Sequence, residues 1–296
     1  MSEPTASPLL TIDHVAHFVP ELDAAAAALT NMGFTLTPFS AQSHRLREDG
    51  PLQPAGTANR CVMLESGYLE FLTPTHDTPN ARQLRDAIAR YTGVHLIAFG
   101  TQAPANDFDR LVREGFDPLP PVALQRQVGT MDGEATARFT VMRVPPDAMA
   151  EGRIQYCQHH TPNVVWQPRW ISHPNRAVGL AGVLICADAP DEAAQRYARF
   201  TGLPVIEKGH FRYLDTAQGY LIFGSPTDFR GWLGINPPAL PWIAGYVIDT
   251  SNFAATLEHV SGHTLDQRLL VPLPDSLGGV MIFQPLGMTP LQIEGS

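Results

Sequence analysis

The feature that most constrains the fold is a pattern that the chain presents four times. Its first copy, residues 11–34, reads TIDHVAHFVPELDAAAAALTNMGF. A short apolar strand is followed by a break, an Ala-rich helix and Gly33, at the position where a helix end favours a left-handed residue. Comparable openings begin near residues 93, 179 and 242. Because a repeat of this length is one supersecondary unit, the pattern predicts four such units in the chain.

Each predicted unit also closes with a strand that ends at a proline. Aligned on these prolines, the closing segments read YLEFLTP, YCQHHTP, YLIFGSP and GVMIFQP. Other alternating segments predict two more strands per unit, least clearly in the fourth unit. We therefore predict an α+β fold of four βαβββ units. The opening strands make His14, His95, Gly182 and Gly245 equivalent, give or take one residue, and the closing strands make Glu70, Gln158, Ile222 and Met281 equivalent.

The composition argues against several classes of function. The formal net charge is −9 and Lys208 is the only lysine, so a basic surface for nucleic acid is not expected. The N-terminus lacks the features of a signal peptide, and no apolar run is long enough to span a bilayer. Cys61, Cys157 and Cys186 are far apart and fit a reducing compartment. We expect a cytoplasmic protein with no nucleic-acid or membrane partner.

The four units resemble those of the vicinal oxygen chelate superfamily. The segments DHVAHFVPELDAAAAAL…GF and GYLEFLTP look like its glyoxalase/bleomycin-resistance/dioxygenase branch. The run QHHTP…W…HPN at 158–175 is similar to bacterial proteins grouped as glyoxalase-like. The resemblance implies that two units form one domain with a curved mixed sheet of eight strands. It also implies a divalent metal in the cupped interior and a substrate that chelates this metal through adjacent oxygen atoms.

On this resemblance the chain divides into two domains of the same type. The first spans residues 8–170 and carries the candidate metal site, and the second spans residues 177–293. Their units are expected at about 8–92, 93–170, 177–235 and 241–293. In the second domain, glycine or an apolar residue stands at every candidate ligand position. We expect that domain to lack a metal and to serve packing, dimerisation or the shape of the pocket.

Four polar residues are the candidate metal ligands: His14, Glu70, His95 and Gln158. Histidine and carboxylate are natural ligands of Zn²⁺, Ni²⁺, Mn²⁺ and Fe²⁺. Pairing of the first two units about a pseudo-twofold axis would bring all four residues into one cup. Each residue alone also suits a structural role, as a satisfied histidine at a strand start or an exposed carboxylate, and the agreement of the repeat favours the metal site.

The acid–base chemistry predicted for this site depends on Glu70. Glyoxalase I-like proteins usually have Glu where Gln158 stands, and an amide cannot act as a general base. Glu70 can serve as ligand and base together. His160 lies two residues beyond Gln158, hence on the same strand face, and is a further acid–base candidate or an alternative ligand. His159 is expected to face the opposite way.

Candidate substrate-binding residues are Asn59, Arg60 and Arg138, which stand at the starts of third strands. Their side chains could bind an anionic or carbonyl-bearing substrate. The alternative is that they are exposed polar residues at strand ends. The expected partner of the chain is therefore a small-molecule substrate, and a homodimer is left open.

Together these features predict a metal-dependent glyoxalase-like enzyme. It would be a lyase or isomerase acting on a small carbonyl or vicinal-oxygen substrate held by a divalent metal: Zn, Ni, Mn or Fe. One alternative is an extradiol-type ring-cleaving dioxygenase, in which His14, His95 and Glu70 supply the two-histidine-one-carboxylate set of non-haem iron. The other alternative is a non-catalytic protein that binds a small molecule such as an antibiotic.

Overall fold

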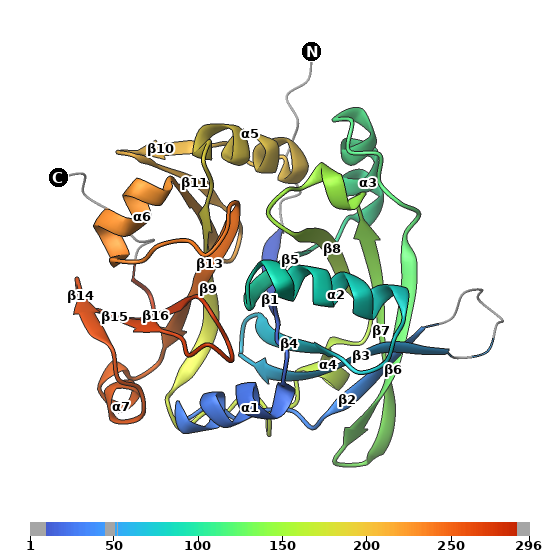
Figure 1. The fold of residues 1–296 in the computed structure, drawn as a ribbon. Coiled ribbons are helices and arrows are strands. Elements are labelled where there is room, and N and C mark those ends of the chain that lie inside the picture. The colour runs from blue at the N-terminus through green and yellow to red at the C-terminus, as the bar shows by residue number, and fades with distance from the viewer. Residues whose placement is uncertain (1–9, 45–50, 52, 289–296) are drawn as a thin grey trace.

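Four βαβββ units follow one another along the chain, as the repeat predicts (Figure 1). The computed structural model describes residues 10–44, 51 and 53–288. The first unit contains β1 (Thr11–Phe18), α1 (Leu22–Asn31), β2 (Ser40–His44), β3 (Gln53–Met63) and β4 (Tyr68–Pro74). The second unit contains β5 (Gly93–Gly100), α3 (Pro104–Arg113), β6 (Val122–Thr130), β7 (Gly133–Arg143) and β8 (Arg153–His159).

The second half of the chain repeats the same order of elements. The third unit contains β9 (Ala177–Cys186), α5 (Pro190–Thr201), β10 (Ile206–Lys208), β11 (Phe211–Asp215) and β12 (Tyr220–Gly224). The fourth unit contains β13 (Trp242–Thr250), α7 (Phe253–His259), β14 (His263–Leu265), β15 (Arg268–Pro272) and β16 (Val280–Pro285). The α+β fold predicted from the sequence is confirmed.

Three further helices lie between the units. They are α2 (Pro79–Arg90), α4 (Pro162–Val165) and α6 (Pro226–Leu233), and a 3₁₀ turn, Pro146–Ala148, joins β7 to β8. The α2 helix begins where the Thr78 hydroxyl accepts a hydrogen bond from the Ala81 amide, with Pro79 in the first turn. No helix in the described part of the chain is long and apolar enough to cross a bilayer.

The opening strands of the units lie at the centre of the sheet. β1 pairs in parallel with β4 and antiparallel with β5, while β9 pairs in parallel with β12 and antiparallel with β13. A single bridge between Ile243 and Val94 connects β13 to β5. The strand order in the first half is β2-β3-β4-β1-β5-β8-β7-β6, and in the second half it is β10-β11-β12-β9-β13-β16-β15-β14. The domain bounds expected near residues 170–177 stay a prediction.

The two halves fill their cupped faces differently. The largest buried cluster lies between the sheet and the helices, with Leu29 of α1, Leu111 of α3 and Phe200 of α5 among its members. On its other face, the second half packs an apolar cluster that includes Leu184, Ile222 and Val247. The first half has a smaller cluster there, closed by Leu84 of α2, and keeps room for a cavity.

The loop before β16 packs tightly against the start of β5. Gly278 has a φ of +66°, and a Cβ atom built on it would lie 1.8 Å from the Thr92 carbonyl oxygen. We expect Gly278→Ala to lower the free energy of unfolding by about 3 kcal/mol, because left-handed strain and a backbone clash add up. Urea unfolding measures the loss.

Gly115 provides the matched control for this prediction. Its φ is +77°, and a Cβ atom there would meet nothing within 4 Å. Gly115→Ala should therefore cost only the conformational strain, about 1 kcal/mol. Equal losses in the two variants would show that the close approach to Thr92 is unimportant.

Candidate functional site

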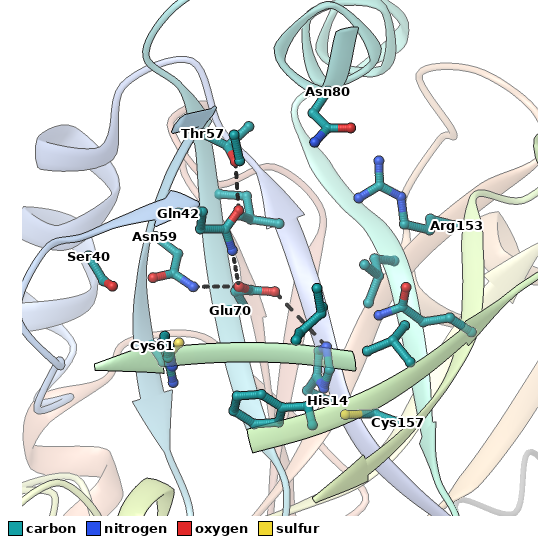
Figure 2. A pocket seen from close by; sticks show the side chains of 18 of the residues that line it. His14, Ser40, Gln42, Thr57, Asn59, Cys61, Glu70, Asn80, Arg153 and Cys157 are labelled. Atoms are coloured by element: carbon teal, nitrogen blue, oxygen red, sulfur yellow. Dashed lines mark hydrogen bonds and ion pairs between the residues drawn. The ribbon is translucent and has the colours of Figure 1, made fainter. Parts of the chain in front are cut away.

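A cavity of about 400 Å³ opens on the cupped face of the first two units (Figure 2). Its wall comes from strands β1 to β8 and from α2. The polar lining residues include His14, Gln42, Thr57, Asn59, Glu70, Asn80, Gln125, Arg126, Arg143, Arg153 and Gln155. Apolar side chains, such as those of Leu72, Leu84, Leu96 and Val141, cover the rest. This is the combination of apolar walls and a few converging polar groups that is typical of a small-molecule site.

Glu70 and His14 form the polar centre of this cavity. Glu70 is buried, and its Oε1 accepts hydrogen bonds from Asn59 Nδ2 at 2.5 Å and from Gln42 Nε2 at 3.3 Å. Its Oε2 lies 4.0 Å from His14 Nε2 (Figure 2). Thr57 donates to Gln42 Oε1 at 2.6 Å and so fixes the orientation of that amide. One carboxylate oxygen is held by amides, and the other faces the histidine.

Asp13 orients His14 by binding the ring nitrogen that faces away from Glu70. The His14 Nδ1 atom lies 2.6 Å from Asp13 Oδ2, and because a carboxylate only accepts, this nitrogen carries the proton. The Nε2 atom of His14 is then left to face Glu70. Burial acts to raise the pKa of Asp13, but hydrogen bonds and charge from His14 and His159 lower it to about 2. Asp13 is therefore a fixed anion that sets the tautomer of His14.

His159 shares the same carboxylate. Its Nε2 lies 3.0 Å from Asp13 Oδ1, and its ring packs against Tyr68, Phe139 and Trp166. His159 faces the opposite way from Gln158, as expected, but it is His159 that lies on the side of the site, because Arg153, Gln155, Cys157 and His159 share the cupped face of β8. One ligand atom from each of Asp13, Cys157 and His159 lies within 4.8 Å of the others.

The predicted ligand His95 does not reach the cavity. Its Nε2–H donates to the Tyr91 carbonyl oxygen at 2.8 Å, and its ring stacks on Tyr91 at 4.0 Å and on Phe18 at 5.3 Å. Burial lowers the pKa of His95 to about 4, against the opposing effect of the hydrogen bond to Tyr91. The prediction that it joins His14 and Glu70 in one cup is wrong. His95 is a neutral, packed histidine.

Strand register explains this error. Across β1 and β5, His14 pairs with Ala98 and Ala16 pairs with Leu96. The pseudo-twofold partner of His14 is therefore Leu96, one residue beyond His95, and Leu96 lines the cavity. His95 is the extra residue of a β-bulge, because the pairing of β5 with β1 steps from Leu96 to Val94, and its ring lies between Tyr91 and Phe18 instead of in the cavity.

The same register shows that Gln155, and not Gln158, is the residue of the second unit that corresponds to Glu70 in the first unit. Glu70 lies beside Ala16, and the corresponding neighbour of Ala98 is Gln155 on β8. Gln155 lines the cavity, whereas Gln158 lies opposite Thr140 on β7 and does not. The placement predicted for Gln158 is wrong. The closing strands were aligned on the prolines that close them, and the number of residues between this proline and the paired part of the strand differs between the units.

Of the other predicted site residues, one lines the cavity and three do not. Asn59 lies in the cavity and binds Glu70. Arg60 and Arg138 do not line it, and His160 is exposed, with its ring 2.8 Å from the Thr140 hydroxyl. The structure therefore does not support their predicted places in the site. Three arginines that the sequence reading missed do line the cavity: Arg126, Arg143 and Arg153.

The alternation of side chains along β8 could have predicted that Arg153 and Gln155 line the cavity. Arg153 and Gln155 precede Cys157 by four and two residues, so all three must share one face of β8. The position of Arg126 carries no comparable signal, because it depends on how the β6–β7 hairpin folds over the cup.

Comparison with known proteins agrees with this fold. A family model described as a glyoxalase-like domain matches residues 12–201, about two thirds of the chain. The chain belongs to this glyoxalase-like family. The matched region contains the whole cavity and extends through α5. A search of curated proteins finds no match.

Three solved structures are similar to this glyoxalase-like chain. A hypothetical protein from Staphylococcus aureus has a TM-score of 0.66 at 12% identity, over 94% of this chain and 100% of that one. A mutant of 4-hydroxymandelate synthase from Streptomyces coelicolor has a TM-score of 0.56 at 15% identity, over 95% of each chain. A xylose isomerase-like TIM barrel/4-hydroxyphenylpyruvate dioxygenase fusion protein has a TM-score of 0.58 at 10% identity, over 98% of this chain and 51% of that one.

At such low identities these structures show the fold. Together with the family match they confirm the resemblance to the vicinal oxygen chelate superfamily. In the second half of this glyoxalase-like chain, the register places Gly182 and Ile222 where the first half has His14 and Glu70. The cupped face there holds the apolar cluster around Ile222. The polar centre therefore occurs once.

The neutral state of His95 makes stability depend on pH. The unfolded chain binds a proton at this ring near pH 6.5, whereas the folded chain binds it only near pH 4. Stability should therefore be complete above pH 6.5 and fall as the pH drops toward 4, with a slope of up to about 1.4 kcal/mol per pH unit. Chemical unfolding at several pH values measures this slope.

His95→Phe tests the assignment, because the aromatic stack is kept and the titrating group is removed. The slope should decrease by about one proton, or about 1.4 kcal/mol per pH unit. His17 supplies a second proton of the same kind, since burial lowers its pKa to about 4 as well. An unchanged slope in His95→Phe would refute the neutral, packed state of His95.

Proposed function

We propose that the cavity of the first two units is the active site of a glyoxalase-like lyase or isomerase. Its substrate would be a small molecule with a carbonyl or vicinal oxygen groups. The observation that carries this proposal is the pairing of Glu70 Oε2 with His14 Nε2 at 4.0 Å inside the cavity. A carboxylate and an oriented imidazole at this distance can both contact one small substrate.

The chain's own residues can carry the proton transfers. Glu70 is placed to take a proton from the carbon next to a carbonyl, because its Oε1 is fixed by Asn59 and Gln42 while Oε2 faces the histidine. His14 Nε2 is placed to exchange a proton with the substrate oxygen, and Asp13 stabilises the ring when it is protonated. The apolar walls limit access of water to the developing charge.

A divalent metal at this centre is the second part of the proposal. His14 Nε2 and Glu70 Oε2 are 4.0 Å apart, and two atoms bonded at about 2.1 Å to a tetrahedral cation lie about 3.4 Å from each other, so a shift of about 0.6 Å would let the pair serve as two ligands. Asp13 on the far nitrogen of His14 is the usual outer partner of a metal-bound histidine. When bound, the metal would supply Lewis-acid polarisation of a substrate oxygen.

The donor set at this centre is smaller than the four residues expected from the sequence. Leu96 occupies one of the counterpart positions, and the oxygen of Gln155 accepts a hydrogen bond from Arg143 Nε at 3.1 Å. Leu96 thus offers no ligand, and the Gln155 oxygen has one acceptor site occupied by Arg143, which leaves most of the coordination sphere to water or substrate. The set of two histidines and one carboxylate proposed for a dioxygenase is not assembled from His14, His95 and Glu70.

A dioxygenase stays the second candidate because of a different cluster. Asp13, Cys157 and His159 bring three ligand atoms within 4.8 Å and adjoin the same cavity. Oxygen uptake with catechols after loading with Fe²⁺ distinguishes this candidate from the isomerase. A binding protein without catalysis is the third candidate, and it predicts ligand binding with no turnover of any carbonyl compound.

Proton exchange tests the role of Glu70. We expect the protein to exchange α-hydrogens of small oxo acids and hydroxyketones with solvent in D₂O, as followed by NMR. Glu70→Gln keeps the shape and removes the base, so exchange should fall by at least about 10²-fold. The matched control is Gln158→Ala, which lies outside the cavity and should leave exchange unchanged. Equal exchange in the wild type and Glu70→Gln would refute the proposal.

Metal titration tests the ligand assignment separately. Calorimetry with Zn²⁺ or Ni²⁺ should show one site on the intact chain, weakened at least about 10-fold in His14→Ala and in Glu70→Gln. His95→Phe should bind the metal as tightly as the wild type does. Loss of the site in His95→Phe, or its retention in both other variants, would place the metal elsewhere.

A further inference from the structure

The cavity holds more positive than negative charge. Arg126, Arg143 and Arg153 line it, and among the lining residues that the structure describes Glu70 is the only carboxylate. Within the described part of the chain, none of the three arginines forms an ion pair with Asp or Glu. In a protein with a formal net charge of −9, this local excess of cations needs an explanation.

Arg153 is held in place without neutralisation. Its terminal Nη2 donates to Gln83 Oε1 of α2 at 3.1 Å, and its guanidinium lies 5.7 Å from the Phe18 ring centroid. Burial lowers its pKa to about 10, the charge of Arg143 lowers it further, and the charge of Glu70 opposes the change. An amide and an aromatic ring orient a cation but do not offset its charge, and Arg153 is half-buried, so part of its charge lies outside bulk water without a partner.

Arg143 is also held by an amide and has no carboxylate partner among the described residues. Its Nε donates to Gln155 Oε1 at 3.1 Å, and burial lowers its pKa. A guanidinium has five N–H donors, and this contact uses the one on Nε, so the two terminal nitrogens remain for another acceptor. Arg126 adds a third guanidinium, whose Nε is buried without a hydrogen-bond partner.

The sheet places these cations across the cavity from the catalytic centre. Glu70 lies beside Ala16 on β1, Ala16 lies beside Leu96 on β5, and Leu96 lies beside Arg153 on β8. These four residues form one row of neighbours across β4, β1, β5 and β8, with Glu70 at one end and Arg153 at the other. At about 4.8 Å per strand their backbones are roughly 14 Å apart, less where the sheet curves. Figure 2 shows both side chains at the cavity, with Arg153 near Asn80.

We propose that Arg143 and Arg153 form a subsite for a small oxyanion of the substrate, a carboxylate or a phosphate. The substrate would be a short aliphatic molecule with this anion at one end and the reacting carbonyl at the other, lying over Leu96. The inference rests on the proposed function of the same cavity. Two guanidinium groups with free N–H edges are the geometry that recognises such an anion, and its charge would neutralise the half-buried arginines.

Calorimetry and thermal unfolding of the intact chain test the subsite. The probes are 4-oxopentanoate, the neutral analogue 2-pentanone, and inorganic phosphate. We expect 4-oxopentanoate or phosphate to bind and raise the midpoint of unfolding, and 2-pentanone to do neither at the same concentration. Binding of the anion should weaken as salt is added, since opposite charges meet.

Arg153→Gln and Arg143→Gln remove one cation each and should weaken anion binding by at least 10-fold, an effect of the size expected for one charge-assisted contact. The matched control is Arg138→Gln, which lies outside the cavity and should bind as the wild type does. Without ligand, Arg153→Gln should unfold at the same temperature or higher, because a half-buried charge without an ion-pair partner is lost. This readout shows whether the variant is folded.

The outcomes separate the subsite from the proposed function. Anion binding that persists in Glu70→Gln and is lost in Arg153→Gln supports the subsite, even if no proton exchange is found. Exchange that depends on Glu70 but is equally fast in Arg153→Gln keeps the function and overturns the subsite. Equal binding of 2-pentanone and 4-oxopentanoate, or no binding of either anion at millimolar concentration, also overturns it.

Discussion

The register of β1 against β5 is the constraint on which the chemistry of the cavity depends. It places Ala16 beside Leu96, and from there the parallel neighbours Glu70 and Arg153 follow at the two ends of one row. Backbone pairing on both sides of β1 holds this register between its two bulges, so the positions of Glu70 and Arg153 relative to each other are fixed by the sheet. A shift of one residue would turn His14 out of the cup and bring Val15 into it.

Within that frame, Asp13 determines what His14 can do. The carboxylate binds the inner nitrogen of His14 and also the ring of His159, so one buried anion orients two histidines. Either use of the site benefits from this arrangement, because a proton-transferring imidazole and a metal-bound imidazole both need a fixed tautomer. Glu70 is prepared in a similar way by Asn59 and Gln42, which bind one of its oxygens and leave the other toward His14.

The two halves of the chain show how one fold can be used for different purposes. In the first half, the cupped face carries charged groups and a cavity, closed on one side by α2. In the second half, the equivalent positions hold Gly182 and Ile222, and an apolar cluster fills the cup. Charged groups of the first cup lower stability unless they are paired, and the second half can contribute the packing that the first half gives up.

The sequence by itself determined the four βαβββ units, the fold class and the empty ligand positions of the second half, and it placed His14 and Glu70 in one cup. These follow from periodicity, helix ends and strand order, which are local properties of the chain. Only the tertiary structure decided that Leu96 rather than His95 and Gln155 rather than Gln158 face the cavity, and that Arg126, Arg143 and Arg153 enter it. The physical reason is the two-residue period of a strand: an alignment uncertain by one residue cannot tell the cup from the opposite face, whereas pairing across the sheet can.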